Sequence, residues 1–235
     1  GAPMTSPYLE AMAKLLNARG ITVHRFEFDY MAARRAGGAR RPAPRAETLV
    51  GAYHHAILSC RARIGRDARL FIGGKSMGGR IACLTAAELQ RSSSVDTKFE
   101  QRPKSDQKEG SAIHGVGVLG FPLHPPRKPQ ISRANALAAP TCPVLVAQGT
   151  RDPFCGREAF AELALPSTVR IHWIEDGDHD LTPRRSSGRV QAGQQDGGLH
   201  LGRGDRLRIA DRQQLGGAGD RERQSVAAAR DEAGA

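Results

Sequence analysis

Cysteine is scarce in this chain, and the cysteines that occur follow no ligand pattern. The four of them are Cys60, Cys83, Cys142 and Cys155, and no two have Cys-x-x-Cys spacing. This spacing predicts neither a zinc site nor a disulfide framework, so we expect no metal. Few, unpaired cysteines are typical of a reducing compartment, which indicates the cytoplasm, with the nucleus as the alternative.

Long apolar runs are also absent, and no stretch is long enough to span a membrane. Negative charge is outweighed, because the formal net charge is +11, and arginines gather in segments 34–45 and 61–69. A basic surface of this kind can attract an acidic protein partner or a nucleic acid. Segment 34–45 mixes its arginines with Gly and Pro and contains no aromatic residue. That mixture favours a solvated loop over nucleic-acid binding.

Two segments lack the apolar residues that a core needs. Residues 91–112 are polar and charged, with Phe99 the only aromatic, and residues 191–235 contain no Phe, Trp, Tyr, Pro, Met or Cys. Such compositions predict disorder. We therefore expect one domain over residues 1–190, a disordered insertion at 91–112, and a disordered or aberrant tail at 191–235.

Strand-like and helix-like patterns alternate through the rest of the chain, which predicts an α/β fold with a mostly parallel sheet and helices on both faces. The expected helices are residues 6–19, 46–64, 77–90 and 156–163, and the expected strands are residues 21–28, 70–73, 115–120, 144–148 and 169–174.

The stretch that says most about function lies between the expected strand 70–73 and helix 77–90. There Gly74-x-Ser76-x-Gly78 matches the nucleophile elbow, in which a sharp turn presents a serine at the start of a helix. Small residues two before and two after the serine let strand and helix approach closely. The free N–H groups of the helix N-terminus favour negative charge beside the hydroxyl. The plainer alternative is a Gly-rich turn with an incidental serine.

Two more residues complete a catalytic pattern. Asp152 follows the expected strand 144–148, and His179 lies in the loop after strand 169–174. The carboxyl ends of parallel strands meet at one edge of a sheet, so these residues should converge with Ser76. We predict Ser76 as nucleophile, His179 as its base, and Asp152 as the acid that orients the histidine. The backbone N–H of Met77 would be one oxyanion-hole donor.

Each of these residues also has a plainer interpretation. Asp152 precedes a proline and could simply form an Asx turn. His179 could be a solvated loop histidine among Asp176, Asp178 and Asp180, whose carboxylates compete for the acid role. The occurrence of serine, aspartate and histidine in this order, each after a strand, favours the catalytic interpretation.

Five segments carry a family resemblance: residues 1–7, 25–31, 74–80, 120–126 and 177–189. Together they resemble the α/β-hydrolase-like family of testis-expressed protein 30 and subunit 3 of the nonspecific lethal chromatin complex, whose bacterial members are described as dienelactone-hydrolase-like. The resemblance implies an α/β-hydrolase fold, the triad Ser76, Asp152 and His179, and no cofactor. It also implies that some members serve as interaction proteins.

The chain departs from this family at its start. In relatives, Gly-Ala-Pro-Met ends a strand and loop that supply the second oxyanion donor, whereas here Gly1 opens the chain. We therefore expect the N-terminal strands to be missing and Ala2 to be the remnant of that donor loop.

Two further side chains are candidates for substrate binding. Lys75 would favour an anionic substrate or be solvent-exposed, and His124 would touch substrate or pack in a proline-rich turn.

The sequence thus predicts a serine hydrolase that cleaves a small ester or related acyl substrate without a cofactor. The alternative is a non-catalytic interaction module, in a chromatin-associated complex, that binds a protein partner through its basic surface.

Overall fold

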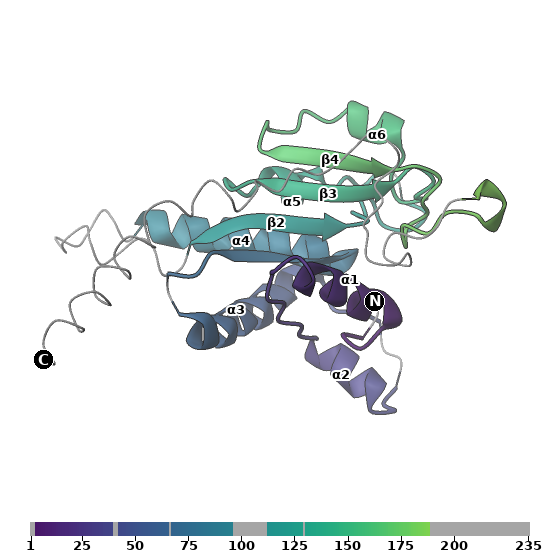
Figure 1. Cartoon of the computed structure of the whole chain (residues 1–235). Coiled ribbons are helices and arrows are strands. Elements are labelled where there is room, and N and C mark those ends of the chain that lie inside the picture. Colours follow the sequence, from purple (N-terminus) through teal and green to yellow (C-terminus); the bar gives the residue numbers. More distant parts are fainter. Residues whose placement is uncertain (1–2, 40–41, 66, 96–111, 129, 189–235) are drawn as a thin grey trace, which may run out of the picture. The chain divides into compact units, whose positions relative to one another are not determined.

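A parallel sheet lies at the centre of the part of the chain that the computed structural model describes, residues 3–39, 42–65, 67–95, 112–128 and 130–188 (Figure 1). Its strands pair in chain order and are β1 (Leu70–Lys75), β2 (Ile113–Leu119), β3 (Val144–Gly149) and β4 (Val169–Ile174). All three pairings are parallel, as predicted. The carboxyl ends of all four strands therefore lie at one edge of the sheet.

One face of the sheet forms the core. Val116, Val118, Val144 and Val146 are each at most 3% exposed and belong to one cluster of buried apolar side chains. Helix α4 (Met77–Val95) packs on β1 and β2 at this face, and the short helix α5 (Ala134–Ala138) packs beside α4 (Figure 1). Because side chains alternate along a strand, the intervening residues point to the other face.

The remaining helices frame the sheet. They are α1 (Pro7–Asn17), α2 (Asp29–Arg35), the 3₁₀ turn η1 (Ala46–Leu49), α3 (Val50–Ile64), α6 (Arg157–Ala161) and the 3₁₀ turn η3 (Arg185–Ser187). Helix α1 begins at Pro7, after the Ser6 side chain caps its first turn by accepting from the N–H of Leu9. The predicted helix 46–64 begins as η1 before α3, and the sequence did not predict α2 or α5.

The predicted strand 21–28 is wrong, because these residues join no strand ladder in the described structure. The Tyr53 hydroxyl of α3 accepts from the N–H of Gly73 at 3.0 Å and donates to the Gly73 carbonyl at 2.6 Å. The backbone of β1 at Gly73 is thus bonded to a helix side chain. Phe26 and Phe28 pack their rings on Tyr53, at centroid distances of 4.8 and 6.3 Å, so the segment is held by aromatic packing.

Of the two segments predicted to be disordered, the structure describes only the two ends of one, residues 91–95 and 112. Helix α4 continues five residues past the expected end at Gln90, to Val95, so the insertion predicted at 91–112 begins within a helix. Residues 96–111 and the tail 191–235 lie outside the described residues. No helix within the described ranges is long and apolar enough to cross a membrane.

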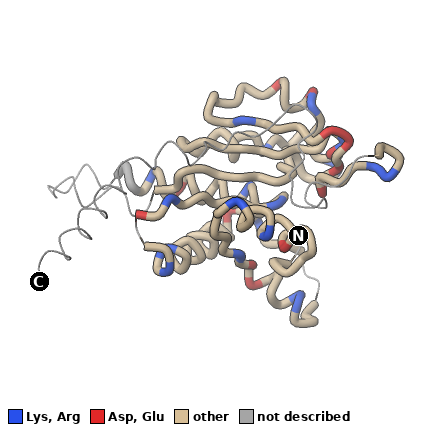
Figure 2. The backbone as a smooth tube through the Cα atoms, in the orientation of Figure 1, with Lys and Arg blue, Asp and Glu red and all other residues tan. Residues whose placement is uncertain are grey.

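The arginines that the sequence predicted to form a basic surface do not all lie on the surface, and those that do are spread over several elements. Arg61 is only 8% exposed, and its guanidinium donates to the backbone carbonyls of Gly65, Ala68 and Ala112, so it belongs to the interior. Figure 2 shows Lys and Arg scattered over several elements, with acidic residues gathered in the loop after β4. Arg40, Arg41 and Arg66 lie outside the described residues. A protein partner for this surface stays a prediction.

Candidate active site

Ser76 occupies a strained turn between β1 and α4. Its φ is +53°, in the left-handed region that few non-glycine residues adopt. Its N–H donates to the Leu119 carbonyl at 2.8 Å, which ties the turn to the end of β2. The hydroxyl is thereby presented at the N-terminus of α4, as the elbow motif predicts.

The need for small residues at this turn differs from the sequence prediction in one position. A Cβ at Gly74 would lie 2.7 Å from the carbonyl carbon of Gly78, so a side chain there would collide with backbone. A Cβ at Gly78 would meet nothing within 4 Å. The tight position is instead Gly79, where a Cβ would lie 2.6 Å from Val118 Cγ1. The close contact between helix and sheet is therefore at Gly79, one residue after the predicted Gly78, because α4 packs against Val118 there.

The structure brings Ser76, His179 and Asp152 together from three separate loops. His179 Nε2 lies 2.8 Å from Ser76 Oγ, and His179 Nδ1 lies 2.8 Å from Asp152 Oδ2. Because a carboxylate only accepts, Nδ1 carries the hydrogen and Nε2 is left to accept the serine proton. The histidine side chain is 19% exposed and the aspartate side chain is fully buried. The Phe154 ring meets the imidazole edge-on, with centroids 4.6 Å apart.

The carboxylate of Asp152 is held by a partner that the sequence analysis missed. Gln148 Nε2 donates to Asp152 Oδ2 at 2.7 Å, and Gln148 Oε1 accepts the N–H of Phe121 at 2.7 Å. The N–H of Phe154 donates to the other carboxylate oxygen at 2.9 Å. Gln148 is completely buried, and a glutamine in an otherwise apolar strand was the signal that could have identified it.

The three acidic residues that competed for the same role have other partners. Asp176 accepts from Arg151 and from Arg184, and Asp178 Oδ1 accepts the backbone N–H groups of Asp180 and Thr182. Asp180 pairs with Lys75, as described below. Within the described residues, Asp152 is therefore the carboxylate in contact with His179.

Two glycines at strand ends let the histidine loop approach the sheet. A Cβ at Gly120 would lie 2.7 Å from the His179 carbonyl oxygen, and Gly120 also has a φ of +64°. A Cβ at Gly149 would lie 2.3 Å from the carbonyl oxygens of both Gly177 and Asp178. Any larger residue at Gly149 would push away the loop that carries His179.

The other predicted site residues are placed as follows. Met77 is the first residue of α4, so its N–H belongs to the group that lacks an intrahelical partner. Ala2 lies outside the described residues.

Lys75 forms an ion pair with Asp180 and lies 5.8 Å from the centre of the Tyr8 ring. Its hydrogen bond holds the pKa of Asp180 below the usual value, so the charge of Lys75 is largely matched inside the protein.

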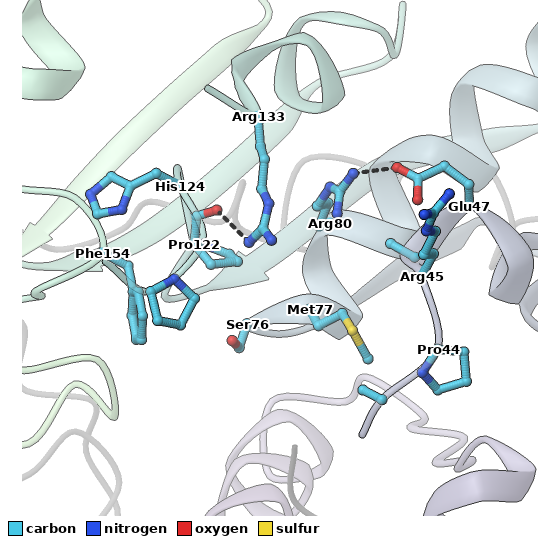
Figure 3. A pocket seen from close by; sticks show the side chains of 13 residues that line it. Pro44, Arg45, Glu47, Ser76, Met77, Arg80, Pro122, His124, Arg133 and Phe154 are labelled. Carbon is cyan, nitrogen blue, oxygen red and sulfur yellow. Dashed lines mark hydrogen bonds and ion pairs between the residues drawn. The ribbon is translucent and has the colours of Figure 1, made fainter. Parts of the chain in front are cut away.

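A pocket of about 410 Å³ opens beside Ser76 and Met77 (Figure 3). Residues 43–47 line one part, Pro122, His124 and Pro126 from the loop after β2 line another, and Arg80, Arg133 and Phe154 complete it. His124 lines this pocket, and its Nδ1 donates to the Pro125 carbonyl of its own turn at 3.1 Å, so a role in substrate binding stays a prediction. Lys75 is not among the lining residues.

Comparison with known proteins identifies the architecture. A family model described as an alpha/beta hydrolase domain matches residues 1–197. Among solved structures, an alpha-beta serine hydrolase homologue from Coxiella burnetii is 18% identical, with a TM-score of 0.50, and the match covers 75% of this chain and 70% of that one. Est1E from Butyrivibrio proteoclasticus is 13% identical, with a TM-score of 0.48 and coverage of 76% and 75%. The family match confirms the predicted α/β-hydrolase fold.

Proposed function

The chain belongs to the alpha/beta hydrolase family, and from that premise we propose that it is a serine hydrolase that cleaves ester or related acyl bonds through an acyl-enzyme. The observation that supports this most is the pair of 2.8 Å contacts that link Ser76 Oγ to His179 and His179 to the buried Asp152. This is the geometry that activates a serine hydroxyl.

The reaction runs in two steps. Nε2 of His179 takes the hydroxyl proton as Ser76 Oγ bonds to the acyl carbon, and the proton then passes to the leaving oxygen as its bond to that carbon breaks. In the second step a water molecule gives a proton to His179 as its oxygen bonds to the acyl carbon. The bond between that carbon and Ser76 Oγ then breaks, His179 returns the proton to Oγ, and the carboxylic acid leaves. Asp152 holds the imidazole in the tautomer that both steps need. The N–H of Met77 donates to the oxyanion that forms on the carbonyl oxygen.

Fluorophosphonate labelling read by intact mass tests this proposal. We expect one adduct on the parent chain and none on Ser76→Ala. His179→Ala should be labelled at least roughly 1000-fold more slowly, because the base that activates the serine is gone. Ser132→Ala is the matched control, since Ser132 is exposed and its hydroxyl accepts the N–H of Ala134 two residues later. An equal adduct on Ser76→Ala, or no adduct on a parent chain with a cooperative unfolding transition, would contradict the assignment.

The narrower resemblance to testis-expressed protein 30 and nonspecific lethal complex subunit 3 belongs to this proposal as well. It adds the non-catalytic interaction module as the second candidate function. The same labelling experiment separates the two, because an interaction module has no need of an activated serine.

A further inference from the structure

The pocket beside Ser76 is lined by more positive than negative charge. Arg45 precedes η1, Arg80 lies on α4, and Arg133 precedes α5, so three separate segments each contribute a guanidinium. Glu47 is the one carboxylate among the lining residues. In Figure 3 the ends of Arg80 and Arg133 lie on the same side of the pocket, with Ser76 and Met77 below them.

The charges of these arginines are only partly compensated within the described structure. Arg80 pairs with Glu47, whose side chain is 58% exposed, and the buried Nε of Arg80 has no hydrogen-bond partner among the described residues. Arg133 reaches only the Pro122 carbonyl, at 3.5 Å. The guanidinium of Arg45 has neither a hydrogen bond nor an ion pair within the described ranges.

The neighbouring charges act on one another. Partial burial, followed by the nearby positive charge of Arg80, lowers the pKa of Arg133, while Glu47 opposes the shift. Cations held in this way are stabilised when an anion enters the site. Guanidinium groups suit that task, because their planar donors match the oxygens of a carboxylate or a phosphate.

We propose that Arg45, Arg80 and Arg133 bind an anionic group, a carboxylate or a phosphate, carried by the substrate that Ser76 attacks. The chain would then hydrolyse anionic esters in preference to neutral ones. This inference rests on the proposed function of Ser76. The anionic group takes no part in bond making and serves to place the acyl carbon. A pocket of about 410 Å³ limits the substrate to a small molecule.

The test compares two chromogenic esters that differ only at the end remote from the reaction. Mono-4-nitrophenyl adipate carries a carboxylate where 4-nitrophenyl hexanoate carries a methyl group. After subtraction of spontaneous hydrolysis, kcat/KM for the adipate should exceed that for the hexanoate roughly 10- to 100-fold, since hydrogen bonds to charged groups are strong. Inhibition of hexanoate hydrolysis by free adipate or by inorganic phosphate shows which anion the site prefers.

Charge variants give the inference its direction. Arg133→Gln should lower the adipate-to-hexanoate ratio about tenfold or more, and Glu47→Gln should raise it, because it removes the one competing carboxylate. Arg170→Gln is the control, since Arg170 lies near the amino-terminal end of β4 and does not line the pocket. Equal rates on both esters, or a ratio that neither pocket variant changes, would overturn the inference.

Failure of the proposed function would look different. If neither ester is hydrolysed, calorimetric titration of the folded chain with adipate and with inorganic phosphate decides the question. If an anion binds and Arg133→Gln weakens that binding, the anion site is supported even though Ser76 is inactive. Absence of binding for both anions would overturn it.

Discussion

Gln148 acts on the proposed site indirectly, through the hydrogen bond that it donates to the Asp152 carboxylate. The substitution Gln148→Leu keeps the approximate size of the side chain and removes both its donor and its acceptor. Asp152 would lose its 2.7 Å hydrogen bond from Nε2, and the N–H of Phe121 would lose its 2.7 Å acceptor. Both Gln148 and Phe121 are 0% exposed, so water cannot replace either bond.

The expected cost follows from these two losses. A hydrogen bond to a charged group contributes about 1.5–3 kcal/mol, and a buried N–H without a partner costs about 1–3 kcal/mol. We therefore expect the free energy of unfolding to fall by roughly 3–5 kcal/mol. Labelling of Ser76 should slow roughly 10- to 100-fold, because Asp152 would keep only the N–H of Phe154 to fix its orientation toward His179.

Urea unfolding and fluorophosphonate labelling measure the two effects. The matched control is Gln90→Leu, because Gln90 Oε1 also accepts a backbone N–H, that of Thr141 at 2.8 Å, in an exposed position. There water can satisfy the freed N–H, so the loss should be about 1 kcal/mol or less. If Gln148→Leu costs no more than Gln90→Leu and leaves labelling unchanged, the reasoning about Gln148 is refuted.

Three further predictions concern other parts of the structure. Gly149→Ala should slow labelling of the serine more than about tenfold, because the new Cβ would displace the histidine loop, whereas Gly117→Ala, whose Cβ would meet nothing within 4 Å, should label normally. Arg61→Met should lower the free energy of unfolding by about 2–4 kcal/mol in urea titrations, because it removes the hydrogen bonds that this buried side chain donates to the Ala68 and Ala112 carbonyls. The exposed Arg63→Met should cost under about 0.5 kcal/mol, and equal losses would refute this. Burial, with a smaller contribution from a nearby carboxylate, raises the pKa of Tyr8 to about 12, so its contribution to stability is complete below pH 10 and is lost as pH rises toward 12. Absorbance at 295 nm should show this tyrosine neutral at pH 10 in the folded protein, and half-ionisation near pH 10 would contradict the burial of its ring.

Much of the fold could be predicted from local patterns. Strand β4 has both of the bounds that the sequence predicted, and α3 ends at Ile64 as expected. Apolar runs of β-branched residues and helical periodicity are properties of neighbouring residues, so they can be read without knowledge of the rest of the chain. The convergence of Ser76, Asp152 and His179 could also be predicted, because parallel strands bring their carboxyl ends to one edge.

The segment 21–28 shows where local pattern was insufficient. Its alternation of apolar and polar residues predicts a strand, but a strand also needs a neighbour with free backbone groups. The N–H and carbonyl of Gly73 are bonded to Tyr53 instead, and no local pattern reveals that contact.

The chain order and chemical types of the residues at the candidate site were therefore inherent in the sequence, because both follow from strand order and motif spacing. Contacts between distant residues became known only in the folded chain. Asp152, and not a neighbouring aspartate, contacts His179, and Gln148 donates a hydrogen bond to that Asp152 carboxylate. Arg45, Arg80 and Arg133 line one pocket. The physical reason is that such pairings depend on side-chain distances of a few ångströms, which are set when the sheet and helices pack together.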